Sequence, residues 1–337
     1  MTNGITPSPR HGFRMDLGDD ALTERVTQGM GEVETLLRER LQQGEAFITD
    51  KVMHLAAAGG KRFRPLVALL CSEFGPNPGA TNVIKGATIT EMVHLATLYH
   101  DDVMDEASIR RGAESANSRW GNSVAIMVGD FLFARASETV AKLGTEYVAL
   151  QARTFSRLVQ GQIAETRGPQ PDEDPLEHYL QVVSDKTASL ISAAAVFGAM
   201  VSDASAEIVE SLREFGEQIG SVFQLSDDII DITSTRTGKT PGTDLREGVA
   251  TLPTLMLQAS TDPADDELKD LLTADLMDQH NLDRALAGLR ASHVIDEARA
   301  EVQRRADLAR GHLAILPAGD ARTALETLCD EVVSRSS

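Results

Sequence analysis

The sequence predicts an all-α protein that folds as a single large helical bundle. Over most of the chain, apolar residues recur at spacings of three and four with charged residues opposite them, which is typical of amphipathic helices. Alanine and leucine are frequent and clusters of β-branched residues are few, which also favours helix. No segment shows the strict alternation of apolar and polar residues that a half-buried strand would need.

The expected helices follow one another with short loops. Gly59 and Gly60 end the second helix, and Pro65 lies in the first turn of the third, as glycine and proline prefer. Glycine- and proline-rich loops are expected at residues 75–78, 168–171 and 237–242. The long helices are expected at residues 21–43, 47–58, 81–105, 123–143, 146–166, 176–201 and 207–232, with shorter ones after residue 251. Residues 1–18 are expected to be a flexible tail, and residues 19–337 one helical domain.

Composition and charge exclude several classes of protein. The formal net charge is −19 and the isoelectric point is near 4.8, which argues against binding to nucleic acid. The two cysteines form no C-x-x-C motif, and the N-terminal residues contain no apolar signal segment. The longest apolar stretch, residues 188–201, is too short to span a bilayer. We therefore expect a cytoplasmic protein without nucleic-acid partners or stable membrane insertion.

Two five-residue segments repeat one acidic pattern, D-D-x-x-D, near the ends of long apolar helices. The acidic residues are Asp101, Asp102 and Asp105 in the first segment and Asp227, Asp228 and Asp231 in the second. Residues i and i+4 share a helix face, so each segment projects at least two carboxylates to one side. A solvated helix end would explain one such segment. Two copies, each followed by basic residues, indicate a common ligand instead.

The clustered carboxylates predict a site for a hard cation. Three acids at the negative end of a helix dipole repel one another, and a cation relieves that repulsion. Oxygen ligands without His or Cys suit Mg²⁺ better than Zn²⁺. Because Mg²⁺ keeps coordination positions for phosphate oxygens, a diphosphate can bridge metal ions held by the two helices.

Basic residues gather at four places in this acidic chain. They are Lys61, Arg62 and Arg64 on a glycine-rich turn, Arg110 and Arg111 after the first acidic segment, Lys186 within a helix, and Lys239 after the second segment. Two diphosphates would supply partners for these cations. Each cluster alone has a simpler interpretation, since a lysine can extend from an apolar helix to water and paired arginines can end a helix. The glycine-rich turn lacks the spacing of a Walker P-loop.

Three polar side chains lie in phase with these clusters. His94 precedes Asp101 by seven residues, two turns back on the same helix face, which favours a diphosphate contact over a satisfied core histidine. Gln224 precedes Asp227 by three residues, and Gln162 follows Gly161 on another helix. Either amide could be only a buried hydrogen-bonding group.

Taken in order, these motifs resemble the trans-isoprenyl diphosphate synthases. The resemblance covers about residues 30–260 and rests on G-K-R-x-R-P, D-D-x-x-D with R-R-G behind it, G-Q, K-T, F-Q-x-x-D-D-x-x-D and the final G-K. Residues 95–100, LATLYH, are most similar to the medium- and long-chain polyprenyl synthases, such as those serving menaquinone side chains. The resemblance implies an all-helical homodimer with an apolar cavity inside each bundle. It also implies head-to-tail (1′-4) condensation of isopentenyl diphosphate with allylic diphosphates, giving an all-trans polyprenyl diphosphate for quinone side chains, with only transient membrane contact for product release.

The resemblance also implies roles for individual residues. Roughly three Mg²⁺ ions per active site would be held on the allylic diphosphate by Asp101, Asp102, Asp105, Asp227, Asp228 and Asp231. Isopentenyl diphosphate would be bound by Lys61, Arg64, His94 and Arg111. The allylic diphosphate would be bound by Arg110, Lys186 and Lys239, with Thr187 and Gln224 facing the allylic carbons. The catalytic set would comprise Asp101, Asp102, Asp105, Lys186, Asp227, Asp228 and Lys239.

Product length is expected to depend on one face of the helix that carries Asp101. The residues going back along that face are Thr97, Ala96, Val93, Met92 and Ile89. Short-chain members of the family place bulky aromatic residues at the positions matching Ala96 or Thr97, and none of these five is aromatic. We therefore expect a tail longer than four isoprene units and products of roughly C30–C50. Tight packing of Ala96 against a neighbouring helix is the alternative interpretation.

Other functions remain open on sequence alone. A geranylgeranyl or farnesyl diphosphate synthase would share every motif and differ in product length. A class I terpene cyclase also carries D-D-x-x-D, but its second motif normally mixes Asn or Asp, Ser or Thr, and Glu, and it needs no isopentenyl site. A non-catalytic synthase subunit usually loses acidic motifs, and a plain acidic cation-binding protein would leave the basic clusters unexplained.

Overall fold

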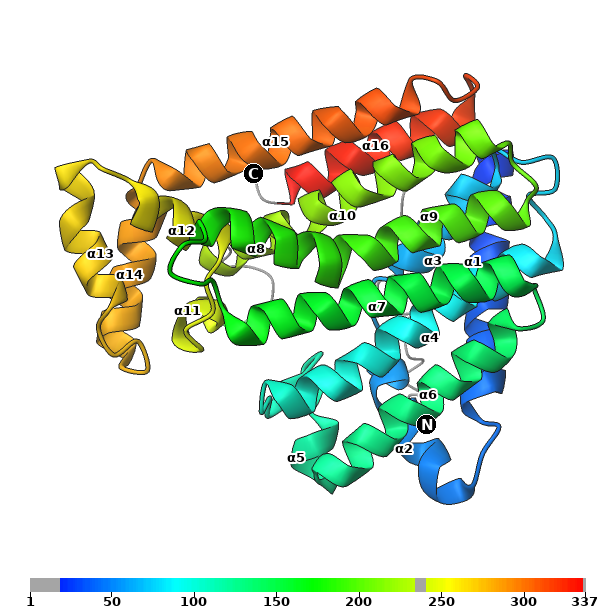
Figure 1. The fold of residues 1–337 in the computed structure, drawn as a ribbon, viewed down its shortest axis with the longest axis horizontal. Coiled ribbons are helices and arrows are strands. Elements are labelled where there is room, and N and C mark those ends of the chain that lie inside the picture. Colours follow the sequence, from blue (N-terminus) through cyan, green and yellow to red (C-terminus); the bar gives the residue numbers. More distant parts are fainter. Residues whose placement is uncertain (1–18, 234–240, 336–337) are drawn as a thin grey trace, which may run out of the picture. The chain divides into compact units, whose positions relative to one another are not determined.

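The computed structural model describes residues 19–233 and 241–335 and confirms the all-α prediction. The helices from the N-terminus to the second acidic motif are α1(Asp20–Leu41), α2(Ala46–Ala57), α3(Phe63–Ser72), α4(Thr81–Met104), α5(Ala116–Trp120), α6(Asn122–Val140), α7(Thr145–Arg167), α8(Pro175–Val183), η1(Ser184–Ala188), α9(Ser189–Val201) and α10(Ala206–Thr233). The later ones are α11(Thr243–Arg246), α12(Leu252–Ala259), η2(Pro263–Asp265), α13(Asp266–Leu272), α14(Gln279–Ala291), α15(Val294–Leu313) and α16(Asp320–Ser334) (Figure 1).

The chain divides into two compact units. Among the described residues, the first contains 19–151 and 194–209, and the second contains 152–193, 210–233 and 241–335. The division falls within α7, α9 and α10. The prediction that residues 19–337 form one domain therefore stays a prediction.

In the first unit, α4 is buried on most sides and carries the first acidic motif at its end. Helix α1 is capped by Asp19, whose side chain accepts a hydrogen bond from the Leu22 amide at 2.7 Å, and the apolar stripe of the helix packs inward. Helix α6 packs closely on α4, because a Cβ atom at Gly129 would lie 2.2 Å from the His100 ring. This packing fixes the direction in which the last turn of α4 presents its carboxylates.

A short β-hairpin follows the first acidic motif, and the sequence did not predict it. Strands β1(Ile109–Arg110) and β2(Ala113–Glu114) pair antiparallel, with Ile109 opposite Glu114. Arg111 and Gly112 form the turn with positive φ angles of 53° and 75°. Strands of two residues are too short to produce an alternating pattern that can be recognised.

The predicted helix over residues 176–201 is interrupted by a π-helical turn, η1, which lies in the second unit. Glycines on α10 allow η1 and the start of α9 to pack closely against α10. A Cβ atom at Gly220 would lie 2.6 Å from the Ala188 Cα atom, and one at Gly216 would lie 2.4 Å from that of Ser192. Helices α15 and α16 lie side by side and end the described chain (Figure 1). Helix α10 carries the second acidic motif in its last turns.

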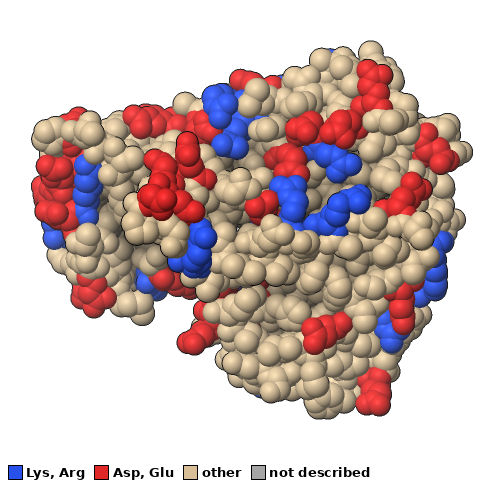
Figure 2. Space-filling view, viewed as in Figure 1, with Lys and Arg blue, Asp and Glu red and all other residues tan. Residues whose placement is uncertain are grey.

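One apolar helical stretch of the described chain, Pro175–Val201, has the length and composition needed to cross a membrane. However, 78% of its apolar 18-residue window is buried, as in a core helix. On the face drawn in Figure 2, the Lys and Arg side chains of the described residues lie among Asp and Glu and form no continuous basic stripe.

Candidate functional site

The first acidic motif presents its three carboxylates differently. Asp102 is buried and accepts a hydrogen bond from Arg110 Nε at 2.5 Å, while Asp101 is half-buried and Asp105 is exposed. Arg110 Nη2 lies 3.7 Å from Asp105 Oδ2. Burial raises the pKa of Asp102, and Arg110 opposes that rise. Asp101 and Asp105, four residues apart, are therefore the carboxylates accessible on one face.

The donor set fits a hard cation completed by other oxygen ligands. Asp102 Oδ2 is buried and makes no hydrogen bond of normal geometry, although the Ala116 amide lies close enough to lower the carboxyl pKa. Within the described residues, no three His, Cys, Asp or Glu side chains converge closely enough to hold a metal ion by themselves. Mg²⁺ commonly takes only one or two protein carboxylates and completes its shell with water and phosphate oxygens.

A second cluster, which we call the cation cluster, is formed by side chains from α3, α4 and the hairpin turn. Arg64, His94 and Arg111 come together here, and Arg111 Nη2 lies 3.4 Å from His94 Nε2. Burial, together with the charges of Arg64 and Arg111, lowers the pKa of His94 well below its ordinary value, so the ring is neutral and accepts from Arg111. Lys61, in the loop before α3, is exposed.

Arg64 indicates what this cluster is built to hold. Its Nε atom is buried without a hydrogen-bond partner, and its surroundings lower the pKa of the guanidinium to about 10, mainly through desolvation and with a contribution from Arg111. A buried, unpartnered guanidinium nitrogen is costly, and a phosphate oxygen would satisfy it. The cluster is therefore suited to a small, highly charged anion.

The adjacent hairpin residues Arg110 and Arg111 belong to different clusters, Arg110 to the carboxylates and Arg111 to the cation cluster. Arg110 bonds to the carboxylates, whereas Arg111 donates to the Gly59 carbonyl at 2.5 Å and the Leu55 carbonyl at 3.2 Å. The left-handed backbone at Arg111 allows consecutive side chains to reach these different partners.

In the second unit, Asp228 is buried within a hydrogen-bond network. It accepts from the Tyr179 hydroxyl, from the Leu252 amide at 3.1 Å and from Gln224 Nε2 at 3.2 Å. Burial raises the pKa of Asp228 to about 6, and these hydrogen bonds limit the rise. Thr187 Oγ1 in turn donates to Gln224 Oε1 at 3.3 Å. Three predicted site residues therefore form one connected chain.

The other two acids of this motif have different partners. Asp227 accepts from Arg335 Nη2 at 2.5 Å, so a residue near the C-terminus neutralises it. Asp231 accepts from the Asp244 amide at 3.2 Å. Tyr179 and Arg335 were missed by sequence reasoning, since neither lies in a motif and both are distant in sequence from the aspartates they contact.

The π-helical turn η1 carries Lys186 and Thr187. Lys186 pairs with Glu165, and a Cβ atom at Gly161 would lie 2.8 Å from the Lys186 amide nitrogen. Arg157 anchors the turn by donating to Asp185 at 2.9 Å and to Glu217 at 2.6 Å. Turns of this kind are rare and occur frequently at functional sites. Gly161, the glycine of the G-Q motif, is therefore explained by the close approach of the Lys186 backbone. Gln162 Oε1 is buried without a hydrogen-bond partner.

The remaining predicted residues have the following positions. Lys239 lies outside the described residues. Met92, Val93 and Ala96 are buried on α4, and half-buried Thr97 donates to the His94 carbonyl at 2.9 Å. The burial of these side chains fits both interpretations of Ala96, a path for a long product tail and tight packing against a neighbouring helix.

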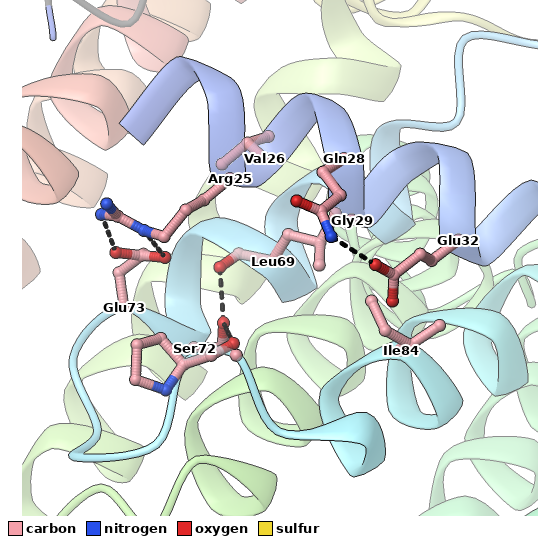
Figure 3. A pocket seen from close by; sticks show the side chains of 11 residues that line it. Arg25, Val26, Gln28, Gly29, Glu32, Leu69, Ser72, Glu73 and Ile84 are labelled. Carbon is pink, nitrogen blue, oxygen red and sulfur yellow. Dashed lines mark hydrogen bonds and ion pairs between the residues drawn. The ribbon is translucent and has the colours of Figure 1, made fainter. Parts of the chain in front are cut away.

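A pocket of about 120 Å³ between α1, α3 and the start of α4 contains none of the predicted site residues (Figure 3). Its polar groups already bond to one another. Arg25 pairs with Glu73 at 2.6 Å, Gln28 donates to Glu32, and Ser72 donates to the Leu69 carbonyl. The pocket offers no unsatisfied group that would select a ligand.

Asp228→Asn is expected to change how stability depends on pH. The folded pKa of about 6 lies above that of an unfolded aspartate, so the folded state holds the proton more tightly. The favourable contribution of this group is fully present below about pH 4, and about 3 kcal/mol of it is lost as pH rises from about 4 to about 6, with about half of it remaining at pH 5. The Asn variant lacks this loss. Urea unfolding of both proteins in EDTA, at roughly pH 5 and pH 8, should show wild type losing stability relative to the variant. Parallel pH profiles would contradict this expectation.

Comparison with known proteins agrees with the helical fold. Residues 45–289 match the model of the polyprenyl synthetase family. The chain is 48% identical over 323 residues to nonaprenyl diphosphate synthase of Mycobacterium tuberculosis, covering 95% of this chain and 96% of the relative.

Solved structures give the same result. The geranylgeranyl pyrophosphate synthase of Corynebacterium glutamicum, solved with calcium and isoprenyl diphosphate, superposes with a TM-score of 0.87 at 48% identity, covering 95% of this chain and 99% of that one. A decaprenyl diphosphate synthase of Rhodobacter capsulatus gives 0.84 at 32% identity, covering 94% and 99%. The chain belongs to the polyprenyl synthetase family. The predicted isoprenoid synthase fold and prenyltransferase class are thereby confirmed.

Proposed function

We propose that this chain condenses isopentenyl diphosphate with allylic diphosphates and releases an all-trans polyprenyl diphosphate of medium to long chain. The observation that carries the proposal is the cation cluster with its buried, unpartnered Arg64 nitrogen, accompanied by an accessible carboxylate pair on the same helix as His94. The relatives named as nonaprenyl and decaprenyl diphosphate synthases support the product class.

The residues have separate tasks in this proposal. Arg64, Arg111, neutral His94 and Lys61 hold isopentenyl diphosphate. Lys186, after separating from Glu165, binds the allylic diphosphate together with Arg110 and Lys239. The allylic C–O bond breaks, the isopentenyl double bond attacks the carbocation, and a proton is then lost. Thr187 and Gln224 offer fixed dipoles to the allylic carbons.

The carboxylates of both motifs would hold Mg²⁺, roughly three ions per active site. When bound, the metal supplies positive charge that stabilises the departing diphosphate. The chemistry of the donor set supports this assignment, since every acidic ligand is an oxygen donor and Asp102 retains a buried oxygen without a hydrogen bond of normal geometry.

We further propose a cytoplasmic homodimer that contacts membranes only transiently, to release its product. In the first unit, Ile126 and Met127 on α6 and Phe47 on α2 are exposed apolar side chains that a second copy would cover. Light scattering coupled to size-exclusion chromatography tests the dimer. A monomeric active enzyme would contradict it.

The proposed function is tested with purified protein, Mg²⁺, farnesyl diphosphate and radiolabelled isopentenyl diphosphate. Dephosphorylated products are separated by chromatography, and a parallel reaction contains EDTA. We expect long-chain products that disappear with EDTA. Cyclic products would indicate a terpene cyclase, and no incorporation would indicate a non-catalytic subunit.

A geranylgeranyl diphosphate synthase is the second candidate function. The 48% identity to the C. glutamicum structure over 95% of this chain favours it. The same chromatogram separates the two candidates, because this alternative would stop at about C20, whereas the lack of aromatic residues on this face of α4 predicts longer products.

Lys61→Ala is expected to raise the KM for isopentenyl diphosphate by roughly ten- to a hundredfold, since a charge-assisted phosphate contact contributes about 1.5–3 kcal/mol. Arg111→Ala should act on the same substrate. Lys186→Ala should instead raise the KM for the allylic diphosphate or lower kcat. Steady-state kinetics with each substrate varied in turn measures the contrast. Equal effects of all three changes on both substrates would count against the assignment.

A further inference from the structure

Arg62 lies between Lys61 and Arg64 in the sequence, but its side chain turns into the protein. Its side chain is only 7% exposed. It donates through Nε to Glu34 of α1, through Nη1 to Glu91 of α4 at 2.8 Å, and through Nη2 to the Ala56 carbonyl of α2 at 3.2 Å. Every branch of the guanidinium is therefore used within the protein, on three different helices.

The backbone at Arg62 is unusual as well. Its φ angle is 50°, in the left-handed region that residues other than glycine rarely adopt. Such a conformation costs free energy and persists only where the surroundings fix it. Here it redirects the chain from the glycine-rich turn into α3, and the three contacts of the side chain are what hold it.

Glu91 is the buried anion of this arrangement. Its side chain is 2% exposed, and it precedes His94 by three residues on α4, so the two side chains share a helix face. Burial alone would lower the pKa of Arg62, but Glu91 and Glu34 raise it. Glu91 is also the strongest influence that raises the pKa values of Arg64 and Arg111, which burial lowers. One carboxylate thus offsets the mutual repulsion of three arginines.

A buried ion pair could serve only to tie helices together. Two observations favour a second role. The pair joins the segment that carries Lys61, in the loop, and Arg64, in the first turn of α3, to the helix face that carries His94, so it connects both parts of the cation cluster. In addition, a buried ion pair contributes little net stability compared with apolar side chains of the same volume, so stability alone is a weak reason for it.

We propose that Glu91 and Arg62 are positioning residues for isopentenyl diphosphate, which hold Lys61 and Arg64 in the geometry that binds the diphosphate together with His94 and Arg111. The inference rests on the proposed function. Neither residue touches the substrate. Without the carboxylate of Glu91, the repelling arginines separate and the loop loses its anchor, so binding must first reassemble the cluster.

The test compares Glu91→Gln and Arg62→Lys with a matched control, Glu73→Gln. Glu73 also forms an ion pair with an arginine, Arg25, and ties α3 to α1, yet it lies outside the cation cluster. We expect Glu91→Gln and Arg62→Lys to raise the KM for isopentenyl diphosphate about tenfold or more and to leave the KM for farnesyl diphosphate within about twofold. Calorimetric titration with isopentenyl diphosphate alone should show the same loss. Glu73→Gln should match wild type in both measurements.

The inference is overturned if Glu91→Gln binds isopentenyl diphosphate as tightly as wild type or tighter, or if both KM values rise equally. Should a single variant fail to fold, the double variant Glu91→Met/Arg62→Met replaces the buried pair by apolar side chains. It should fold and still bind isopentenyl diphosphate weakly, and normal binding by it would also overturn the inference. A wild-type chain that binds no isopentenyl diphosphate overturns the proposed function itself, so the two failures are distinguishable.

Discussion

Asp101→Ala and Asp227→Ala are each expected to lower kcat by about a thousandfold, or about 4 kcal/mol of transition-state stabilisation. Each change removes a predicted ligand of the metal ions that neutralise the departing diphosphate. Both carboxylates are half-buried, so truncation leaves no large cavity in the core. Thermal unfolding should change little for either variant.

The neighbouring acids would be poorer choices for this test. Asp102 is buried against Arg110, and Asp228 is buried against Tyr179. Removing either carboxylate leaves buried polar groups unpaired, which destabilises the fold as well as the site. Loss of activity in those variants would therefore have two causes.

Asp296→Ala on α15 is a suitable control, because this aspartate is exposed and outside both motifs. It should retain wild-type kcat. Direct binding of Mn²⁺, followed by electron paramagnetic resonance in the presence of inorganic diphosphate, should weaken in Asp101→Ala and Asp227→Ala only. Near-normal turnover in EDTA, or unchanged metal binding by both variants, would contradict the metal assignment.

The helices and the acidic motifs could be predicted because their signals are local. A period of 3.6 residues reveals an amphipathic helix within a few turns, and D-D-x-x-D places its first and last carboxylates on one face in any helix. Gly59 after α2 and Pro65 within α3 were predicted for the same reason. Their backbone preferences act within one turn.

Other features depend on contacts that no local pattern encodes. The π-helical turn at Lys186 depends on Gly161 and Gly220, which pack against this turn only in the folded second unit. Asp228 and Tyr179 are 49 residues apart, and Asp227 and Arg335 are 108 apart. Such pairs form because buried or clustered charges need partners, and sequence reveals the need without naming the partner.

Arg62 is another residue whose role depends on contacts that the sequence does not reveal. The sequence groups it with Lys61 and Arg64 as one basic cluster. In the structure its side chain turns inward to two glutamates, while Arg64 retains a buried nitrogen without a partner. Residues adjacent in a motif can therefore have unlike roles, which depend on the backbone angle at a single position.

Ala96→Phe is expected to shorten the product from roughly C30–C50 to about C15–C20 while keeping measurable activity. Ala96 lies five residues before Asp101, which places it about 7.5 Å back along α4 from that aspartate. In the proposed reaction the growing tail passes along this face. A phenyl ring there would act as a floor without touching the groups that perform the chemistry.

The buried position of Ala96 makes stability part of the test. If the face is packed solidly, a phenyl ring must displace neighbours, at a cost of about 1–3 kcal/mol. If the face lines a path for the tail, the ring fits and the melting temperature changes little. Product length and melting temperature should therefore be measured on the same protein.

Ala87→Phe provides the matched control. Ala87 is also a buried alanine of α4, but it lies nine residues from Ala96, which is half a turn away on the opposite face. It should cost stability and leave product length unchanged. A wild-type enzyme that stops at C15 or C20 would contradict the open path, and so would an Ala96→Phe variant with wild-type products. If both phenylalanine variants shorten the product equally, the effect comes from general distortion of α4, and the tail does not follow the face of Ala96.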